Sequence, residues 1–311
     1  MDHRTLGTAS DRIGSTSMNV LSYILRVGGR RRVDTLALLA ACVVLCGGCA
    51  STPKPDTEPS PIPAKSYDCH RTEIAPVIDG RLDDSVWTRA AWTDAFVDIE
   101  GPSRPTPHFT TRAKMAWDDR YLYIAARLDE PHVWGTLTQF DSIIYNDNDF
   151  EIFIDPLGDA VEYYEIEINA LGTQLDLYLH TPYSRGGSAR IDWNCIGLRS
   201  AVAVEGTIND PSDVDRAWTL EWAIPWDGLR PPRYDTAWEE RDRGGRPPAV
   251  GDEWKINFSR VQWDHVVDST TQPPTYRRVP GRPEHNWVWT PQWRINMHLP
   301  EHWGRVRFLD L

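Results

Sequence analysis

From Tyr67 to Leu311 the chain is a succession of short runs of β-branched and aromatic residues separated by turn residues, without a convincing amphipathic helix. Apolar and polar residues alternate in Tyr121–Ala126 and in Tyr164–Asn169, the pattern of a strand with one apolar and one polar face. Turns recur at intervals of roughly 8–12 residues, which is typical of all-β sandwiches. The sequence therefore predicts an antiparallel β-sandwich rather than an alternating α/β fold.

The individual elements follow from the same pattern. Two short helices are predicted, at Asp83–Arg89 with Asp83 as the cap and near Trp226–Leu229. The segments Arg230–Val250 and Asp268–Asn286 look like long surface insertions, which in compact domains are functional or disordered. The predicted strands are Arg112–Trp117, Tyr121–Leu128, Phe150–Ile154, Tyr163–Asn169, Leu175–Leu179, Ala201–Val204, Trp218–Ala223, Trp254–Gln262 and Gly304–Phe308.

Residues 1–49 have the features of an export signal. Arg30–Arg32 precede an apolar stretch of about ten residues, Leu36–Leu45, which is too short to span a bilayer of ~30 Å. A Gly-Gly-Cys sequence follows and resembles a bacterial lipoprotein signal, so we expect Cys49 to carry the lipid. Cys42 is the alternative acceptor, and a plain secretory signal without lipid also stays open. We expect an outer-membrane or cell-surface lipoprotein, or otherwise a secreted or periplasmic one.

A linker separates this leader from the globular part. Residues 50–66 are rich in Pro, Ser and Thr and favour neither a helix nor a paired strand, so we expect a spacer, with the domain at 67–311. In an exported protein the two cysteines beyond the leader, Cys69 and Cys195, are candidates for a disulfide, although the sequence does not show whether they are close.

Charge and aromatic content narrow the partners. The chain has a net charge of −12, and residues 1–49 contribute six Arg against three Asp, so the remainder is more acidic still. This balance argues against nucleic acid as a partner. The chain also has 15 Trp and 11 Tyr against 7 Phe, and rings with a polar handle suit surfaces that stack on sugars, as well as sandwich cores. We expect a monomer.

Five landmarks in order resemble the family 9 carbohydrate-binding modules and the wider DOMON-like sandwiches. They are an Ile-Asp-Gly turn leading to a Trp, a central hairpin, an Asp-x-x-Glu-x-Phe-x-Asp-type strand, a Gly-containing turn, and a W-x-x-E-x-x-I-P-W-like signature. The segments concerned are Ile78–Trp87, Ala113–Ile124, Asn146–Pro156, Glu205–Asp210 and Ala217–Trp226. The resemblance extends from about Val77 to Leu311 and implies a β-sandwich that binds plant-type or algal-type polysaccharide or oligosaccharide without catalysis.

The resemblance also implies site residues, because these modules clamp a terminal sugar between two aromatic rings beside a Glu. Glu151 stands at the position of that Glu, and Tyr145 at the position of the first ring. Trp289 or Trp287 is expected as the second ring, since their spacing places both on one face of a strand. Asn169 is a candidate partner for sugar hydroxyls.

The match has one departure and one further implication. Glu167 stands where the family has an Arg, so the solvated face of a strand is the alternative for Glu151 and Glu167. Family 9 modules bind structural Ca²⁺, and Asp155 and Asp159, with Asp149 as a further candidate, have the oxygen ligands that Ca²⁺ prefers. An ordinary acidic turn is the alternative reading of this segment.

Three other functions remain open. Two carboxylates at ~5–9.5 Å separation are typical of glycosidases, but with so many acidic residues some such pair is inevitable. Some DOMON-like sandwiches bind haem through Met and His, and beyond the leader only Met115 and Met297 are available. A surface domain that contacts other proteins is the third alternative. His298 and His302 are spaced for a metal on a helix, which Pro300 between them disfavours.

Overall fold

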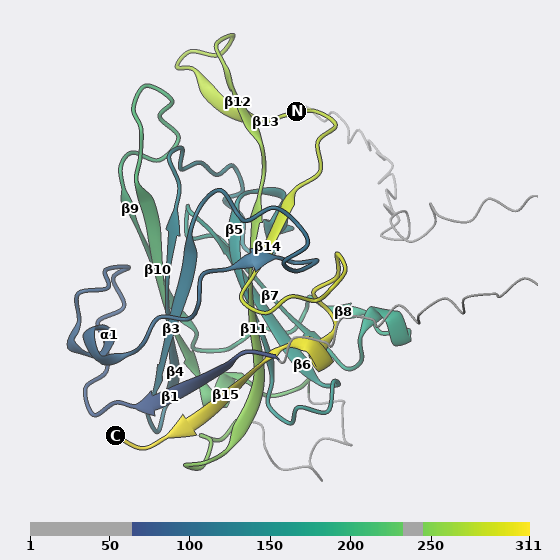
Figure 1. Ribbon diagram of the computed structural model, residues 1–311. Helices are drawn as coiled ribbons and strands as arrows, with labels where there is room; N and C mark the ends of the chain where they lie inside the picture. The colour runs from purple at the N-terminus through teal and green to yellow at the C-terminus, as the bar shows by residue number, and fades with distance from the viewer. Residues whose placement is uncertain (1–63, 233–244) are drawn as a thin grey trace, which may run out of the picture. The chain divides into compact units, whose positions relative to one another are not determined.

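The computed structural model describes residues 64–232 and 245–311, and this part of the chain is almost entirely β-structure (Figure 1). The long strands are β3 (Thr111–Trp117), β4 (Tyr121–Asp129), β5 (Asp149–Asp155), β6 (Tyr163–Asn169), β9 (Arg199–Glu205), β10 (Ala217–Pro225) and β11 (Glu253–Gln262). The shorter ones are β1 (Ser66–Arg71), β2 (Val97–Asp98), β7 (Gln174–Leu179), β8 (Ala189–Arg190), β12 (His265–Asp268), β13 (Thr275–Arg278), β14 (His285–Val288) and β15 (Gly304–Leu309). The helical pieces are α1 (Ser85–Arg89), η2 (Ile144–Asn146), η3 (Tyr183–Arg185), η4 (Trp226–Gly228) and η6 (Pro300–His302).

The strands form one curled sheet in the order β8-β7-β6-β5-β11-β15-β1-β3-β4-β10-β9. β1 lies parallel to both β15 and β3, and the other pairs are antiparallel. One edge of β11 changes partner along its length: Glu253–Ile256 pair with β15, and Ser259–Gln262 pair with β14. The other edge of β11 pairs with β5, so β11 joins the half of the sheet formed by β5 to β8 to the half that runs from β15 to β9. The predicted all-β sandwich is confirmed.

The main core lies between the two halves of the curled sheet. Alternate residues of β5 (Phe150, Ile152, Ile154) face alternate residues of β10, including Trp222, and Phe150 and Trp222 have ring centroids 5.6 Å apart. Burial of each such side chain contributes about 1.5–3 kcal/mol. Because the period is two, the residues between them point away from this core, which leaves Asp149, Glu151, Phe153 and Asp155 on the opposite face of β5.

The Ile-Asp-Gly turn and the W-x-x-E signature are held together by one buried carboxylate. Glu221 in β10 accepts hydrogen bonds from the Trp87 indole (2.6 Å) and from the backbone N–H groups of Gly80 (2.8 Å) and Asp79 (3.0 Å). Gly80 has φ +85°, and a Cβ there would lie 2.7 Å from the Ala203 nitrogen, so glycine is required. These two sequence landmarks therefore form one structural unit.

Most predicted elements are present within a few residues of their predicted limits, but two expectations need correction. The helix at Asp83–Arg89 begins at Ser85, with Asp84 as the N-cap residue, and the Asp84 carboxylate accepts the Val77 N–H instead of capping the helix. The insertion at Asp268–Asn286 contains a strand, because β12 and β13 form a hairpin. In the described residues no helix is long and apolar enough to cross a membrane.

The disulfide considered from the sequence is not formed. Cys69 and Cys195 are both free and both buried. Cys69 lies within β1, whereas Cys195 packs beside Gly228 and donates its backbone N–H to Asp176 (2.8 Å). Burial raises the pKa of both thiols, which keeps them protonated. The leader, the candidate lipidation sites and most of the linker lie outside the described residues, as does much of the insertion at Arg230–Val250.

Candidate functional site

An acidic cluster lies on the face of β5 and β6 that points away from the main core. Glu151 pairs with Glu167 across the two strands, and Asp149 precedes Glu151 by two residues, so all three share one face. One carboxylate oxygen from each lies within 4.8 Å of the others. Glu165, two residues before Glu167, is on the same face of β6. The alternation of Tyr164–Asn169 predicted Glu165 and Glu167 on one polar face, but only Glu151 and Glu167 were considered together at the site.

The cluster is buried, which contradicts the expected half-exposed sheet. Asp149, Glu151 and Glu167 are 0, 5 and 2% exposed. A second apolar cluster covers this face, because η2 and the segment before β15 fold back over it. It consists of Ile99, Ile144, Phe153, Tyr163, Leu175, Leu177, Leu179, Val288, Met297 and Trp303. The alternative of a solvated strand face is therefore excluded for Glu151 and Glu167.

Burial dominates the electrostatics of the cluster. It raises the pKa of Glu151 to about 7. The pKa values of Asp149, Glu165 and Glu167 are raised well above the ordinary carboxyl range, first by burial and then by the charge of Glu151. Like charges in a space shielded from water disfavour ionisation of all members together. The site therefore favours protonated carboxyls, a bound cation, or ligands that donate hydrogen bonds.

Tyr145, which the resemblance gave as the first stacking ring, lies at the edge of this cluster. Its side chain is 48% exposed, while its backbone is anchored on both sides. The Tyr145 N–H donates to Glu167 Oε2 (3.1 Å), and its carbonyl oxygen accepts the Trp263 indole N–H (2.8 Å). The Arg278 guanidinium lies 4.4 Å from the centre of the Trp263 ring. An exposed ring on a fixed backbone is suited to stacking on a ligand.

A second exposed ring, Tyr183 in η3, was missed by the sequence reasoning. Tyr183 is 39% exposed, and His298 packs edge-on against it with ring centroids 4.5 Å apart. His298 is itself held by Tyr163, whose hydroxyl lies 3.1 Å from His298 Nδ1. Burial lowers the pKa of His298 to about 4, so this imidazole is neutral at pH 7.

Electrostatics link Tyr183 to the rest of the site. Burial raises the pKa of the Tyr183 phenol, and the charges of Glu165, Glu167 and Tyr145 raise it further. The Tyr183 phenol therefore interacts electrostatically with these carboxylates and with Tyr145. Tyr183 belongs to the connection between β7 and β8, where no family landmark was found. The sequence signal for a binding role there is limited to an aromatic residue in a Gly-rich turn.

The tryptophans expected as the second ring are core residues instead. Trp287 and Trp289 do share one face, as predicted, but that face is the main core, where they are 2 and 1% exposed. Trp289 packs against Phe258 and closely against Gly304, and the Trp287 ring lies 5.1 Å from the Arg260 guanidinium. Neither has a free ring surface for a sugar, because both rings pack against residues of β11.

Asn169 is close to the site but its amide is already engaged. Its Nδ2 donates to the Leu137 carbonyl (2.8 Å) and to Asp147 Oδ2 (3.0 Å), and its Oδ1 accepts the N–H groups of Leu171 and Thr173. Two donors and two acceptor positions are the full capacity of an amide. Asn169 thus shapes the turn after β6, and all of its amide hydrogen bonds are made within the protein.

The predicted calcium residues hold their own loop. Asp155 accepts the N–H groups of Leu157 (3.2 Å), Gly158 (2.8 Å) and Ala160 (2.9 Å), and Asp159 Oδ1 accepts the N–H of Val161. Both Asp155 oxygens are used in these bonds. This arrangement matches the alternative of an ordinary acidic turn.

The residues considered for haem or histidine-bound metal do not converge. Met115 is buried in the main core and Met297 in the second apolar cluster. His302 ends η6, and within residues 64–232 and 245–311 the only group of three metal-ligating side chains is Asp149, Glu151 and Glu167.

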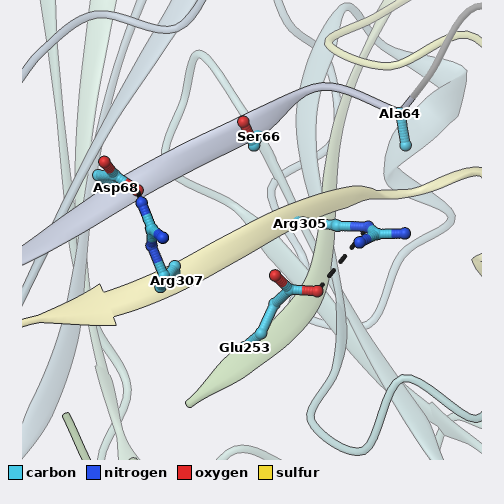
Figure 2. Close-up of a pocket in the computed structure, with 6 residues that line it drawn as sticks. All are labelled: Ala64, Ser66, Asp68, Glu253, Arg305 and Arg307. Carbon is cyan, nitrogen blue, oxygen red and sulfur yellow. Dashed lines mark hydrogen bonds and ion pairs between the residues drawn. The ribbon is translucent and has the colours of Figure 1, made fainter. Parts of the chain in front are cut away.

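An open groove elsewhere on the domain has a different character. Figure 2 shows it crossing β1, β15 and β11, lined by Ala64, Ser66, Asp68, Glu253, Arg305 and Arg307. Its charges are paired with one another: Asp68 with Arg307 at 2.8 Å and Glu253 with Arg305 at 3.8 Å. Without an aromatic ring, this groove has no surface on which a sugar ring would stack.

The fold and site together define a class of protein: an all-β sandwich with exposed tyrosines beside a carboxylate cluster, the architecture of a carbohydrate-binding domain. The sequence profile of the family described as "Carbohydrate family 9 binding domain-like" matches residues 78–237. The chain belongs to this family. β11 to β15, which complete the sheet, lie beyond the matched segment.

Two known proteins and one solved structure are similar to the chain. The chain is 29% identical over 154 residues to Exoglucanase XynX of Acetivibrio thermocellus and 28% identical over 156 residues to Endo-1,4-beta-xylanase A of Thermoanaerobacterium saccharolyticum. Each alignment covers 50% of this chain but only 12% and 11% of the relative. A candidate carbohydrate-binding protein of Bacteroides uniformis has the same fold, with a TM-score of 0.54, 16% identity, and coverage of 79% of this chain and 100% of that one.

Proposed function

We propose that this domain binds the sugar rings of a β-1,4-linked polysaccharide or oligosaccharide at the site that contains Tyr145 and Tyr183. It does so without catalysis. The observation that carries the proposal is the pairing of two exposed, anchored tyrosines with a cluster of carboxylates. The rings offer flat apolar faces to sugar C–H groups, and the tyrosine hydroxyls can exchange hydrogen bonds with sugar hydroxyls. The substrate class comes from the names of the two relatives.

The absence of catalysis is part of the proposal. Glu151 and Glu167 lie close to each other, but both are almost fully buried beneath an apolar cluster. A glycosidase needs its acid and its second carboxylate on either side of an accessible glycosidic bond. The chain also aligns with only 12% and 11% of its named relatives, and the family model that matches the chain is one of binding domains.

Isothermal titration with soluble xylo- and cello-oligosaccharides tests the proposal. We expect wild-type binding without release of reducing sugar. Tyr145→Ala and Tyr183→Ala should each weaken binding by about 10-fold to 100-fold, equal to about 1.4–2.7 kcal/mol, as expected for the loss of one aromatic contact. Trp92→Ala is the matched control, because Trp92 is 37% exposed and contacts Lys114 on the other half of the sandwich.

Two results would count against the proposal. If neither oligosaccharide series binds, the domain has another class of partner. If Tyr145→Ala and Tyr183→Ala bind as tightly as Trp92→Ala, the site lies elsewhere on the domain. Steady release of reducing sugar by wild type and its loss in Glu151→Gln would instead assign an enzyme.

We also propose that the domain is exported and tethered by a lipid on Cys49. The support is the order of basic, apolar and Gly-Gly-Cys segments, followed by the Pro-rich linker. Metabolic labelling with a palmitate analogue should mark the wild type and Cys42→Ser but not Cys49→Ser. Labelling lost only in Cys42→Ser would move the anchor to Cys42, and an unlabelled wild type would indicate a plain secretory signal.

A further inference from the structure

The β12–β13 hairpin brings an arginine to the edge of the proposed sugar site. The hairpin follows β11 in the chain and extends beyond the end of that strand (Figure 1). Within β13, Tyr276 and Arg278 share one face because they are two residues apart, and Arg277 lies on the other face. Tyr276 is buried, whereas both arginines are exposed. The face with Tyr276 and Arg278 is therefore the one turned toward the domain.

Tyr276 fixes this face of the hairpin. Its hydroxyl donates to the Asp210 carbonyl oxygen (3.2 Å) and lies 3.1 Å from His132 Nδ1. The His265 ring, from β12, packs edge-on against the Tyr276 ring with centroids 5.1 Å apart. These contacts hold the backbone that carries Arg278 in a defined place.

The Arg278 side chain is held against the residues next to Tyr145. Its guanidinium carbon lies 4.4 Å from the centre of the Trp263 ring, and one N–H donates to Asn146 Oδ1 (3.3 Å). Asn146 follows Tyr145 in the chain, and the Trp263 indole donates to the Tyr145 carbonyl oxygen (2.8 Å). Two separate contacts therefore connect the guanidinium to the backbone of the exposed tyrosine.

The Arg278 guanidinium also has unused hydrogen-bonding capacity. An arginine side chain has five N–H donors in a planar fork, and the bond to Asn146 uses one of them. The preceding residue, Arg277, pairs with Asp268 at 3.3 Å, whereas Arg278 forms no ion pair within residues 64–232 and 245–311. An exposed guanidinium fixed on an aromatic ring is pre-organised for an anion with two oxygens in one plane, such as a carboxylate.

The negative charge near Tyr145 opposes an anionic ligand only in part. Glu167 accepts the Tyr145 N–H (3.1 Å) and is 2% exposed. Burial raises the pKa of Glu167 well above the ordinary carboxyl range, so this group carries less negative charge at pH 7 than an exposed glutamate does. Arg278 is exposed and keeps its full charge.

We propose that Arg278 binds the carboxylate of a uronic acid residue, so that the site selects acidic over neutral forms of its glycan. This inference rests on the proposed function, because a neutral part of the ligand stacks on Tyr145 while an acidic branch or neighbouring residue reaches Arg278. Trp263 and Asn146 hold the guanidinium in place for this contact.

Isothermal titration with two oligosaccharides that differ in one group is the direct test. The neutral ligand is an unbranched xylo-oligosaccharide, and the acidic ligand is the same chain with one glucuronic acid branch. At pH 7 and low salt we expect wild type to bind the acidic ligand about fivefold more tightly. An increase in ionic strength from about 0.05 M to about 0.5 M should reduce this preference, because the contact is exposed.

Three variants assign the preference to one side chain. In Arg278→Gln the two affinities should become equal, with little change for the neutral ligand. Arg278→Lys keeps the charge but not the planar fork and should keep only part of the preference. Arg277→Gln is the matched control, since Arg277 is the exposed neighbour on the other face, and it should behave like wild type. Circular dichroism and thermal unfolding check that each variant is folded.

The outcomes separate this inference from the proposed function. Equal affinity of wild type for the two ligands overturns the inference and leaves the proposed function intact, whereas binding of neither ligand overturns the proposed function. If Arg278 only fastens the hairpin, Arg278→Gln weakens both ligands equally and leaves their ratio unchanged, which contradicts the carboxylate contact. Loss of the preference in Arg277→Gln, or tighter binding of a sulfate ester of the same oligosaccharide than of the uronate, also contradicts it.

Discussion

Replacing Glu221 with alanine removes the acceptor that joins the two best-matched sequence landmarks. The three donors it leaves behind are the Trp87 indole and the N–H groups of Gly80 and Asp79, which bind Glu221 at 2.6, 2.8 and 3.0 Å. Glu221 is 0% exposed, so water reaches these donors only after local rearrangement. Each buried donor without a partner costs about 1–3 kcal/mol.

One opposing effect reduces the total cost of leaving these three donors without an acceptor. Burial raises the pKa of Glu221, which means that desolvation of the charged carboxylate already costs the folded state some stability. We therefore expect Glu221→Ala to lose about 3–5 kcal/mol of unfolding free energy, and Glu221→Gln about half of that, since an amide offers only one acceptor oxygen. Such a loss is a large fraction of the 5–15 kcal/mol typical of a domain.

Equilibrium unfolding in urea, followed by tryptophan fluorescence, measures the change. Glu253→Ala is the control: Glu253 lies on exposed β-sheet surface and pairs with Arg305 at 3.8 Å, so its removal should change stability by no more than about 0.5 kcal/mol. A Glu221→Ala loss under about 1 kcal/mol, or one equal to that of Glu253→Ala, would refute the role of Glu221 as the clamp of the Ile-Asp-Gly turn.

Two further predictions concern the core and the pH dependence of stability. Trp289→Ala should cost about 3–5 kcal/mol in the same urea assay, because the ring is 1% exposed and fills the space beside Gly304; an unchanged midpoint would mean that the ring is not packed as described. Burial raises the pKa of Asp176 from 3.8 to about 6, so the folded state binds this proton more tightly than the unfolded state and loses stability as pH rises between these values. Asp176→Asn, which keeps an acceptor for the Cys195 N–H, should abolish a loss of up to about 3 kcal/mol across that window, and an identical pH profile in both proteins would contradict this assignment.

The fold could be predicted from the sequence because the signals for strands and turns are local. Alternation with a period of two predicted a strand at Tyr163–Asn169 with the observed limits, and it predicted Glu165 and Glu167 on the polar face of that strand. The cover over that face was not accessible, because it depends on η2 and residues near Trp303, which are distant in the chain. A strand that looks half-exposed in isolation is therefore buried on both sides.

The second ring of the site shows the same limit. Trp289 matched the family in its late position, but aromatic residues occur in both cores and binding sites. The sequence does not indicate that the Trp289 ring packs against Phe258 of β11 on the core side. Tyr183 could not be predicted because it lies in the β7–β8 connection and packs against His298, which is distant in the chain. Tyr145 is six residues before Glu151 on continuous chain, so the resemblance assigned the two residues together.

A crystal structure of the domain with a bound xylo- or cello-oligosaccharide tests the central claim most directly. The account predicts sugar rings stacked on the exposed faces of Tyr145 and Tyr183, with the rings of Trp287 and Trp289 still buried in the core. An oligosaccharide seated in the charged groove between Asp68 and Arg305, or on any surface without these two tyrosines, would contradict it.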